Sequence, residues 1–235
     1  MKGTLRIARR FNGPLDSGQG GYSAGTLAKL MEGPAEVTLR RPVPLETELV
    51  VEQEKDGSLR ALADQDLIME AVAAPELDVE APAPVAPDAA RHAAQRYRGA
   101  REGVFSRCFV CGLAREDALG VFAGDVEGRR LVASPWTPPP WTADSSGHVL
   151  SEFVWAVLDC PTAFAAYLGA ELPMSVLARL AVRITGRVRA GDEHVVMAWP
   201  LGVDGRKRDV GAALLSPGGE PLAVARALMI EPRSA

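Results

Sequence analysis

The 235-residue chain has few cysteines and no long apolar segment, and both absences restrict what it can be. Three cysteines, an odd number, do not make a disulfide framework and agree with a reducing compartment. No window approaches the roughly 20 apolar residues of a membrane span, and the first residues lack the apolar core of a secretory signal. We therefore expect a soluble cytoplasmic protein without a membrane partner.

A strong charge of either sign is also absent. The formal net charge of −4 gives no general attraction to phosphate backbones or anionic lipid, so we expect no nucleic-acid partner. No nucleotide-phosphate loop is visible, and we expect no cofactor. What the chain does have is apolar residues, at 47%, which is enough to bury the core of one large or two smaller domains.

The two halves of the sequence read as copies of one unit, in which a loop of small residues precedes a helix and a series of strands. The first loop and helix are expected over residues 16–21 and 22–31, and the second over residues 144–148 and 149–160. Turns rich in glycine, aspartate and proline separate the strand candidates that follow each helix. Such a duplication is expected to place related sites about a pseudo-two-fold axis.

The boundary between the copies is marked by proline and alanine. Residues 75–103 hold four prolines followed by a basic, helix-capable stretch, Asp88 to Tyr97. Proline fixes the backbone and removes donors, so we expect the first part to be an extended connector rather than core. The domains predicted are a first unit over residues 1–74, this linker, and a second unit over residues 104–235.

Hydrophobic patterning indicates an α+β fold. Val37 to Arg41 and Leu180 to Val188 alternate apolar and polar residues, as half-buried antiparallel strands do. Apolar residues recur at helical spacing in the second helix and predict one buried stripe there: Leu150, Phe153, Val154, Val157 and Leu158. With one helix for several strands in each half, we expect two antiparallel sheets, each wrapping a central helix.

Three short motifs resemble the hotdog-fold acyl-CoA thioesterase superfamily, and in particular its tandem, or double-hotdog, members of actinobacterial type. The motifs are Cys108 to Gly112, Ala133 to Trp136 and Glu152 to Pro161. The resemblance covers nearly the whole chain and implies a tandem hotdog. It also implies an acyl-CoA or related thioester as substrate, and association into a homodimer of double hotdogs.

The thioesterases of this superfamily that resemble phenylacetate-pathway enzymes carry a His-Gly-Gly loop and an acidic residue nine positions beyond that histidine. Here the pattern is divided between the copies. Gln19, Gly20 and Gly21 resemble the loop, but Ala28 stands nine positions beyond Gln19. Asp159 matches the acid, but Leu150 stands nine positions before it. Because hotdog sites lie between two units, the resemblance implies one composite site and a degenerate equivalent on the other side.

Each residue of the composite site has a possible chemical role. Backbone N–H groups of Gly20 and Gly21, at a helix N-terminus, could stabilise an oxyanion. Asp159 could act as general base or nucleophile, with a pKa raised by burial. Gln19 and Asn12 could orient water or a carbonyl group but cannot act as bases. Alternatively, the glycines only permit a tight loop, and Asp159 only ends the helix before a proline.

Three other residues are candidates with a structural alternative each. Glu152 lies two helical turns before Asp159 and is either a rival acid or part of an ion pair with Arg179 or Arg183. His148, just before the second helix, is a base, a contact to substrate or a cap. Trp136, in a stiff loop, either contacts the substrate or packs in the core.

Cys108 and Cys111 have the two-residue spacing of zinc and redox sites. A tetrahedral zinc site needs two further ligands, and Cys160 and the three histidines are too scattered in the sequence to suggest a second pair. We therefore interpret the two cysteines as packing a turn at the start of the second unit, and expect no metal.

The function that these features favour is acyl-CoA thioester hydrolysis at the composite site. A protein that binds acyl-thioesters or another hydrophobic ligand without turnover is the alternative, because neither copy has the complete pattern. An enoyl-thioester hydratase fits less well, since neither helix shows the expected pairing of an aspartate with a histidine in the preceding loop.

Overall fold

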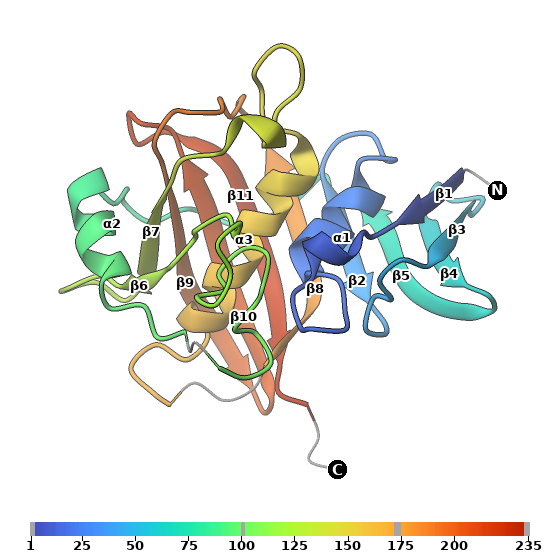
Figure 1. Ribbon diagram of the computed structural model, residues 1–235, viewed down its shortest axis with the longest axis horizontal. Coiled ribbons are helices and arrows are strands. Elements are labelled where there is room, and N and C mark those ends of the chain that lie inside the picture. The colour runs from blue at the N-terminus through green and yellow to red at the C-terminus, as the bar shows by residue number, and fades with distance from the viewer. Residues whose placement is uncertain (1–2, 100–101, 172–174, 233–235) are drawn as a thin grey trace.

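The strands form a single antiparallel sheet, and two helices lie against one of its faces (Figure 1). The computed structural model describes residues 3–99, 102–171 and 175–232. Within these residues the sheet has eleven strands in the order β1-β3-β4-β5-β2-β8-β11-β10-β9-β7-β6. No helix in this described part of the chain is long and apolar enough to cross a membrane.

The elements follow the duplicated order expected from the sequence. The first half contains β1 (Gly3–Arg6), the short helix η1 (Arg9–Phe11), α1 (Gly20–Ala28), β2 (Ala35–Leu39), β3 (Glu48–Gln53), β4 (Leu59–Ala63) and β5 (Asp66–Ala73). The linker contains α2 (Pro87–Ala94). The second half contains β6 (Gly124–Asp125), β7 (Val132–Trp136), the short helix η2 (Pro140–Thr142), α3 (Ser151–Ala165), β8 (Val176–Ile184), β9 (His194–Asp204), β10 (Lys207–Leu215) and β11 (Pro221–Ile230).

The expectation of two separate sheets is corrected by one pairing at the centre. Strand β2 of the first half pairs antiparallel with β8 of the second, with Val37 opposite Leu180. Both of these residues are fully buried, so the alternating patterns of the two strands place their apolar sides on the same face. The two halves therefore share one continuous sheet, because pairing satisfies the backbone groups that each strand would expose at an edge.

Helices α1 and α3 pack closely against each other at glycines of α1. A Cβ atom at Gly21 would lie 2.5 Å from the carbonyl oxygen of Trp155, and one at Gly25 would lie 2.7 Å from the Cβ of the same tryptophan. The contacts run antiparallel, because the start of α1 meets Asp159 and its end meets Glu152. Small residues on α1 thus set the distance between the central helices of the two units.

The apolar stripe of α3 is buried as predicted, with one exception. Phe153, Val154, Val157 and Leu158 are all buried between the sheet and α1. Leu150 precedes the helix as its N-cap residue and is 39% exposed. Because α3 begins at Ser151, Leu150 is not part of the helix, and its side chain does not join the buried stripe.

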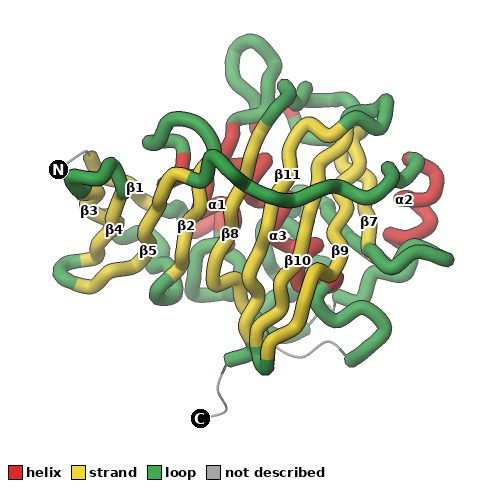
Figure 2. Tube along the Cα trace, turned by 180° about the vertical axis from the view of Figure 1, so that it is seen from behind, coloured by secondary structure: helices red, strands yellow, loops and turns green. Residues whose placement is uncertain are grey.

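The linker crosses the face of the sheet opposite α1 and α3, as the view from behind shows (Figure 2). It has no helix or strand between β5 and α2, but Leu77, Val79 and Val85 are buried on strands of the second half. The predicted connector is therefore extended yet part of a second apolar cluster. Burial there removes from water a sheet face that the helices leave uncovered.

Candidate functional site

The predicted loop and the predicted acid lie in contact where α1 begins. The side-chain Nε2 of Gln19 donates a hydrogen bond to Oδ2 of Asp159 at 2.6 Å. The backbone N–H of Gly21 donates to the same oxygen at 2.7 Å. A residue of the second half is thus held by two donors of the first, which are far from it in the sequence.

The orientation of Gln19 follows from its place before α1. Its backbone N–H donates to the carbonyl of Phe11, and its Oε1 accepts the N–H of Tyr22 at 2.6 Å, so it caps the helix. With the amide oxygen used in this way, the amide nitrogen must point the other way, toward Asp159. Gln19 is only 2% exposed, which fixes the side chain further.

Asp159 lies in an environment that disfavours its charge. It is 7% exposed, and burial raises the pKa of its carboxyl group to about 7, against the opposing effect of the Gly21 N–H. A charge on Cys108 would raise this pKa further. Among the residues that the structure describes, both hydrogen bonds to the carboxylate are accepted by Oδ2, so Oδ1 is the oxygen available for chemistry.

Gly20 leaves space beside this carboxylate. A Cβ atom there would lie 3.0 Å from both Oδ2 of Asp159 and a methyl group of Leu177. The N–H of Gly20 is the first of α1, and it has no hydrogen-bond partner within residues 3–99, 102–171 and 175–232. Glycine at this position therefore presents an unpaired donor at the positive end of a helix next to an acid.

Asn12 lies in the same loop but binds the backbone. Its Nδ2 donates to the carbonyl oxygens of Gly13, Pro14 and Arg107, and its Oδ1 accepts from Arg115 at 2.8 Å. Both ends of the amide are therefore engaged in holding two loops together. The structure does not bring Asn12 into contact with Asp159.

Glu152 lies at the opposite end of the helix pair from Gln19. Its Oε1 forms an ion pair with Lys29, just beyond α1, at 2.9 Å. The partners expected from the sequence are engaged elsewhere, since Arg179 pairs with Glu36 and Arg183 donates to the carbonyl of Leu77. The predicted arginine ion pair is therefore wrong, and a lysine of the other unit takes its place.

His148 and Trp136 lie away from the Gln19–Asp159 contact. His148 lies at the surface, where its Nδ1 is 2.8 Å from the hydroxyl of Ser146 and its backbone N–H donates to Asp144. It lines a shallow surface hollow of about 380 Å³ together with Val188. Trp136 is 2% exposed on β7, where its ring packs near His194.

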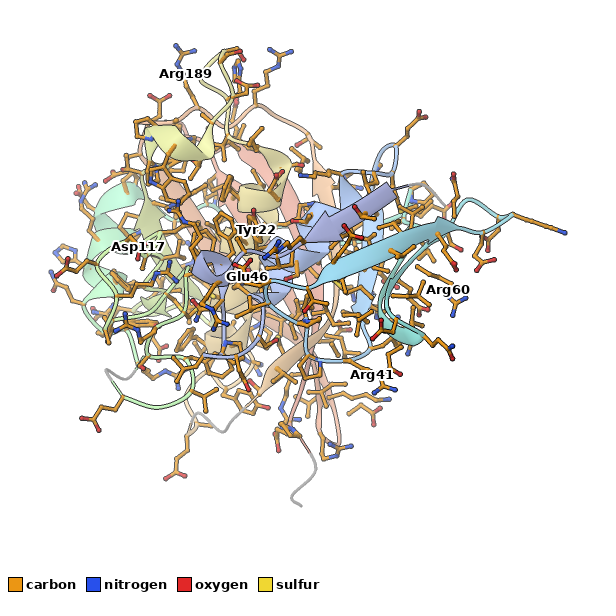
Figure 3. The ribbon with its side chains drawn as sticks, turned by 45° about the vertical axis from the view of Figure 1, so that its right-hand side comes forward. Tyr22, Arg41, Glu46, Arg60, Asp117 and Arg189 are labelled. Carbon is orange, nitrogen blue, oxygen red and sulfur yellow. The ribbon has the colours of Figure 1, made fainter. Side chains whose placement is uncertain are left out.

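An aromatic cluster that the sequence did not suggest surrounds the first residue after the glycine loop. Tyr22 stacks on Phe11 with ring centroids 4.1 Å apart and contacts Phe109 and Phe153. Figure 3 shows Tyr22 in the interior, while Arg41, Arg60 and Arg189 lie at the periphery. The rings come from α1, α3 and two further segments in both halves, so spacing within one segment could not have revealed them.

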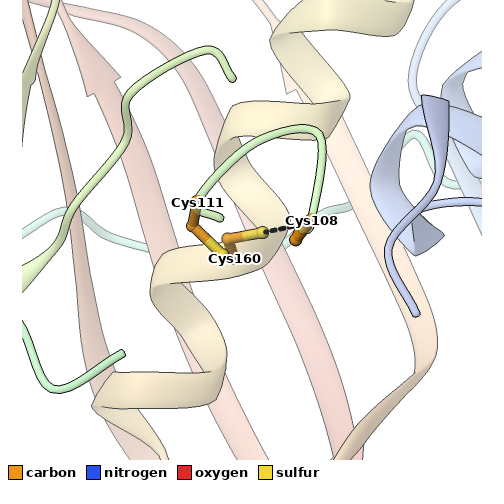
Figure 4. A group of neighbouring side chains, drawn as sticks. All are labelled: Cys108, Cys111 and Cys160. Carbon is orange, nitrogen blue, oxygen red and sulfur yellow. Dashed lines mark hydrogen bonds between the residues drawn. The ribbon is translucent and has the colours of Figure 1, made fainter. Parts of the chain in front are cut away.

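The three cysteines also meet beside this site. Cys108 and Cys111 face Cys160, which follows Asp159 on α3 (Figure 4). The Sγ atoms of Cys108 and Cys160 are 3.8 Å apart, and Nε2 of Gln19 lies 3.6 Å from the sulfur of Cys160. Of the groups of acids, cysteines and histidines in the described residues, this is the one whose ligand atoms converge as a metal site requires.

Comparison with solved structures shows what fold this arrangement belongs to. A protein named as a thioesterase II from Thermobifida fusca aligns with TM-score 0.65 and 13% identity. The alignment covers 98% of this chain and 93% of that protein. A tesB protein of Mycobacterium avium subs paratuberculosis aligns with TM-score 0.62 and 16% identity. The alignment covers 98% of this chain and 92% of that protein. A protein named as a thioesterase from Novosphingobium aromaticivorans aligns with TM-score 0.63 and 12% identity. The alignment covers 98% of this chain and 95% of that protein.

No family model matches the sequence, and no curated protein matches it. The structural likeness nevertheless extends over almost all of each chain, so it concerns the duplicated whole and not one unit alone. The chain has the fold of these three solved structures, the double hotdog that its motifs predict.

Proposed function

We propose that this protein hydrolyses thioesters at a composite site formed by Gln19, Gly20 and Gly21 of the first unit and Asp159 of the second. One observation carries the proposal: two donors of the first unit hold a single oxygen of a buried carboxylate from the second, at 2.6 and 2.7 Å. The likeness in fold to proteins named as thioesterases supports the reaction class.

The geometry suggests a division of labour between the two carboxylate oxygens. Oδ2 of Asp159 is fixed by Gln19 and Gly21, and Oδ1 takes the proton of a water molecule that attacks the thioester carbonyl carbon. The N–H of Gly20 stabilises the negative charge that develops on the carbonyl oxygen. The carbon–sulfur bond then breaks, and the leaving thiolate takes a proton, so that the products are a carboxylic acid and a thiol.

Three further parts of the proposal concern substrate and setting. The thioester is an acyl-CoA, the chain works in the cytoplasm, and two double hotdogs associate as a homodimer. The substrate and the homodimer rest on the resemblance of the motifs Cys108 to Gly112 and Glu152 to Pro161, and the cytoplasmic setting rests on the odd number of cysteines. We propose the unit boundaries 1–74 and 104–235 on the basis of the proline- and alanine-rich linker between them.

The test is release of free thiol from short, medium, long and aryl acyl-CoAs by wild type, Asp159→Asn and Glu152→Gln. We expect turnover by wild type and by Glu152→Gln, and its loss in Asp159→Asn. The asparagine has the same shape and can keep an oxygen at the position of Oδ2, so a folded but inactive variant identifies the carboxylate as essential. Full activity of Asp159→Asn contradicts the proposal.

The second candidate function is binding of a thioester without turnover, and the same hydrogen bonds support it. Gln19 and Gly21 both donate to Asp159, as they would if these bonds only joined the two units. Calorimetric titration with the same acyl-CoAs separates the two functions. Binding with no thiol release from any of them supports the binding protein.

A further inference from the structure

Every cysteine of the chain contributes to one buried cluster that the proposed hydrolysis does not use. Cys108 and Cys111 come from the loop before β6, and Cys160 comes from the middle of α3. Their three sulfur atoms all lie within 4.8 Å of one another, and none forms a disulfide. Cysteines from segments this far apart in the sequence meet only because the loop folds across α3.

We propose that Cys108, Cys111 and Cys160 bind one zinc ion through three thiolates. In a tetrahedral site with zinc–sulfur bonds of about 2.3 Å, ligand sulfurs lie about 3.8 Å apart. The sulfurs of Cys108 and Cys160 have this separation, 3.8 Å. The other sulfur atoms are at most 4.8 Å apart, about 1 Å more than a tetrahedral site needs, and rotation of the side chains can close that difference.

The turn that carries two of the ligands has features that suit a metal site. The N–H of Val110 points at the sulfur of Cys108 at 3.5 Å, and such bonds orient and stabilise a ligating thiolate. The N–H of Gly112 donates to the carbonyl of Cys108. A Cβ at Gly112 would lie 2.5 Å from the backbone nitrogen of Cys108, so glycine is needed for a turn this tight.

A disulfide explains the cluster less well than a metal does. A disulfide brings two sulfurs to about 2.0 Å and leaves the third cysteine unpaired in the interior. Zinc uses all three, and thiolates are among its preferred ligands. No carboxylate or histidine of the described residues converges with the three sulfur atoms, so we assign the fourth position to a water molecule.

The site would join the loop over residues 108–111 to α3 at the residue after Asp159. It adds a metal to a chain for which the sequence suggested none, because the third ligand is found only in the folded structure. The proposal does not depend on thioester hydrolysis, and its test does not measure hydrolysis.

The experiment uses the full chain, stripped with a chelator under reducing conditions and titrated with Co²⁺ and then Zn²⁺. Bound Co²⁺ reports thiolate ligands by sulfur-to-cobalt charge transfer in the near ultraviolet, and tetrahedral geometry by intense visible bands. Since the chain has three cysteines, any such signal comes from this cluster. We expect one equivalent of Co²⁺, displaced by one equivalent of Zn²⁺.

Cys160→Ser removes the ligand supplied by α3 and should weaken zinc affinity by about 100-fold or more, measured by competition with a chromophoric chelator. His148→Asn is the matched control, because it removes an exposed metal-binding side chain outside the cluster and should leave stoichiometry and affinity unchanged. Circular dichroism establishes that each variant is folded, and if Cys160→Ser is not, the cobalt spectrum of wild type decides alone.

The proposal is overturned if folded wild type gives no charge-transfer band while its thiols are reduced. It is also overturned if folded Cys160→Ser binds zinc as tightly as wild type. Recovery of a single free thiol from freshly purified protein, with no zinc by elemental analysis, would instead show a disulfide and reject the metal site.

Discussion

The two ends of the α1–α3 helix pair were expected to be related by the duplication, and they differ in chemistry. At one end, the glycine start of α1 meets Asp159, which is buried and accepts two hydrogen bonds on one oxygen. At the other end, the start of α3 meets the end of α1 through the ion pair of Glu152 with Lys29, which is 43% exposed. Equivalent helix ends have thus become a candidate reaction site and a partly buried ion pair.

The difference arises from which residue types each helix supplies. The first end has small residues on α1 and an acid on α3. At the second end, Leu150, Ser151 and Glu152 stand where α1 has Gln19, Gly20 and Gly21, and Ala28 supplies no carboxylate. Duplication alone therefore gives the helix contact twice, but within the described residues a glycine loop donates hydrogen bonds to an acid of the other unit at the first end and not at the second.

We expect Asp159→Asn to have the largest effect on the rate of thioester hydrolysis, and so to test the difference between the two ends most directly. Removing a general base costs about 10²- to 10⁴-fold in rate, so thiol release should fall by that factor. The midpoint of thermal unfolding should not decrease much, because the lost charge was one that burial disfavours. If Asp159→Asn loses rate only in proportion to its loss of folded protein, Asp159 is not catalytic and the two ends do not differ in function.

A smaller loss of rate is expected from Gln19→Ala. This change removes one of the two donors that fix Asp159, and a misplaced catalytic group can cost about 10²-fold. It also removes the cap of α1, which should lower the free energy of unfolding by about 0.5–2 kcal/mol.

Asn12→Ala is the matched control for Gln19→Ala, because Asn12 is an amide of the same loop that contacts other backbone groups and not Asp159. We expect it to lower stability but to keep the rate within a small factor of wild type. Equal rate losses in the two variants would mean that the loop acts only through its folding.

Gly25→Ala probes the packing between the two ends. The added methyl group would lie 2.7 Å from the Cβ of Trp155, and overpacking of this kind costs about 1–3 kcal/mol. Chemical denaturation should show that loss, with a decrease in rate if the helices separate. Gly202→Ala is the control, since among the described residues its methyl group would meet Asp209 at an ordinary 3.9 Å.

The smallest effect is expected from Glu152→Gln. An ion pair with a partly exposed lysine is worth about 0–1 kcal/mol, so both stability and rate should remain close to wild type. A double-mutant cycle with Lys29→Met measures the pair itself. A rate loss as large as that of Asp159→Asn would make Glu152 the working acid and reverse the comparison.

Much of this arrangement could be predicted from the chain alone, because the relevant signals are local. The glycine loop, the apolar stripe of α3 and the position of Asp159 on it are short patterns, and the duplicated order suggests which segments meet. Whether Asp159 is catalytic stays a prediction. The zinc proposal required the fold, since nothing in the spacing of Cys160 from Cys111 indicates that a loop will cross α3.

The pairing of β2 with β8 was also hidden from the sequence. Alternating patterns show that both strands have one buried face, but they do not show which strand lies at each edge. The ion pair of Glu152 with Lys29 was missed for a similar reason, because the distance between helices depends on Gly21 and Gly25 of α1. Contacts between units are decided by packing, and packing is not periodic along the chain.

The shared sheet has a consequence for the nascent chain during its synthesis on the ribosome. Strand β2 emerges long before β8, so the nascent first unit carries an unpaired edge while the linker and most of the second unit are still being made. An open edge can recruit another strand from a neighbouring nascent chain. Chains that terminate before Val176 should therefore self-associate, and completion of β8 is the step that ends this exposure.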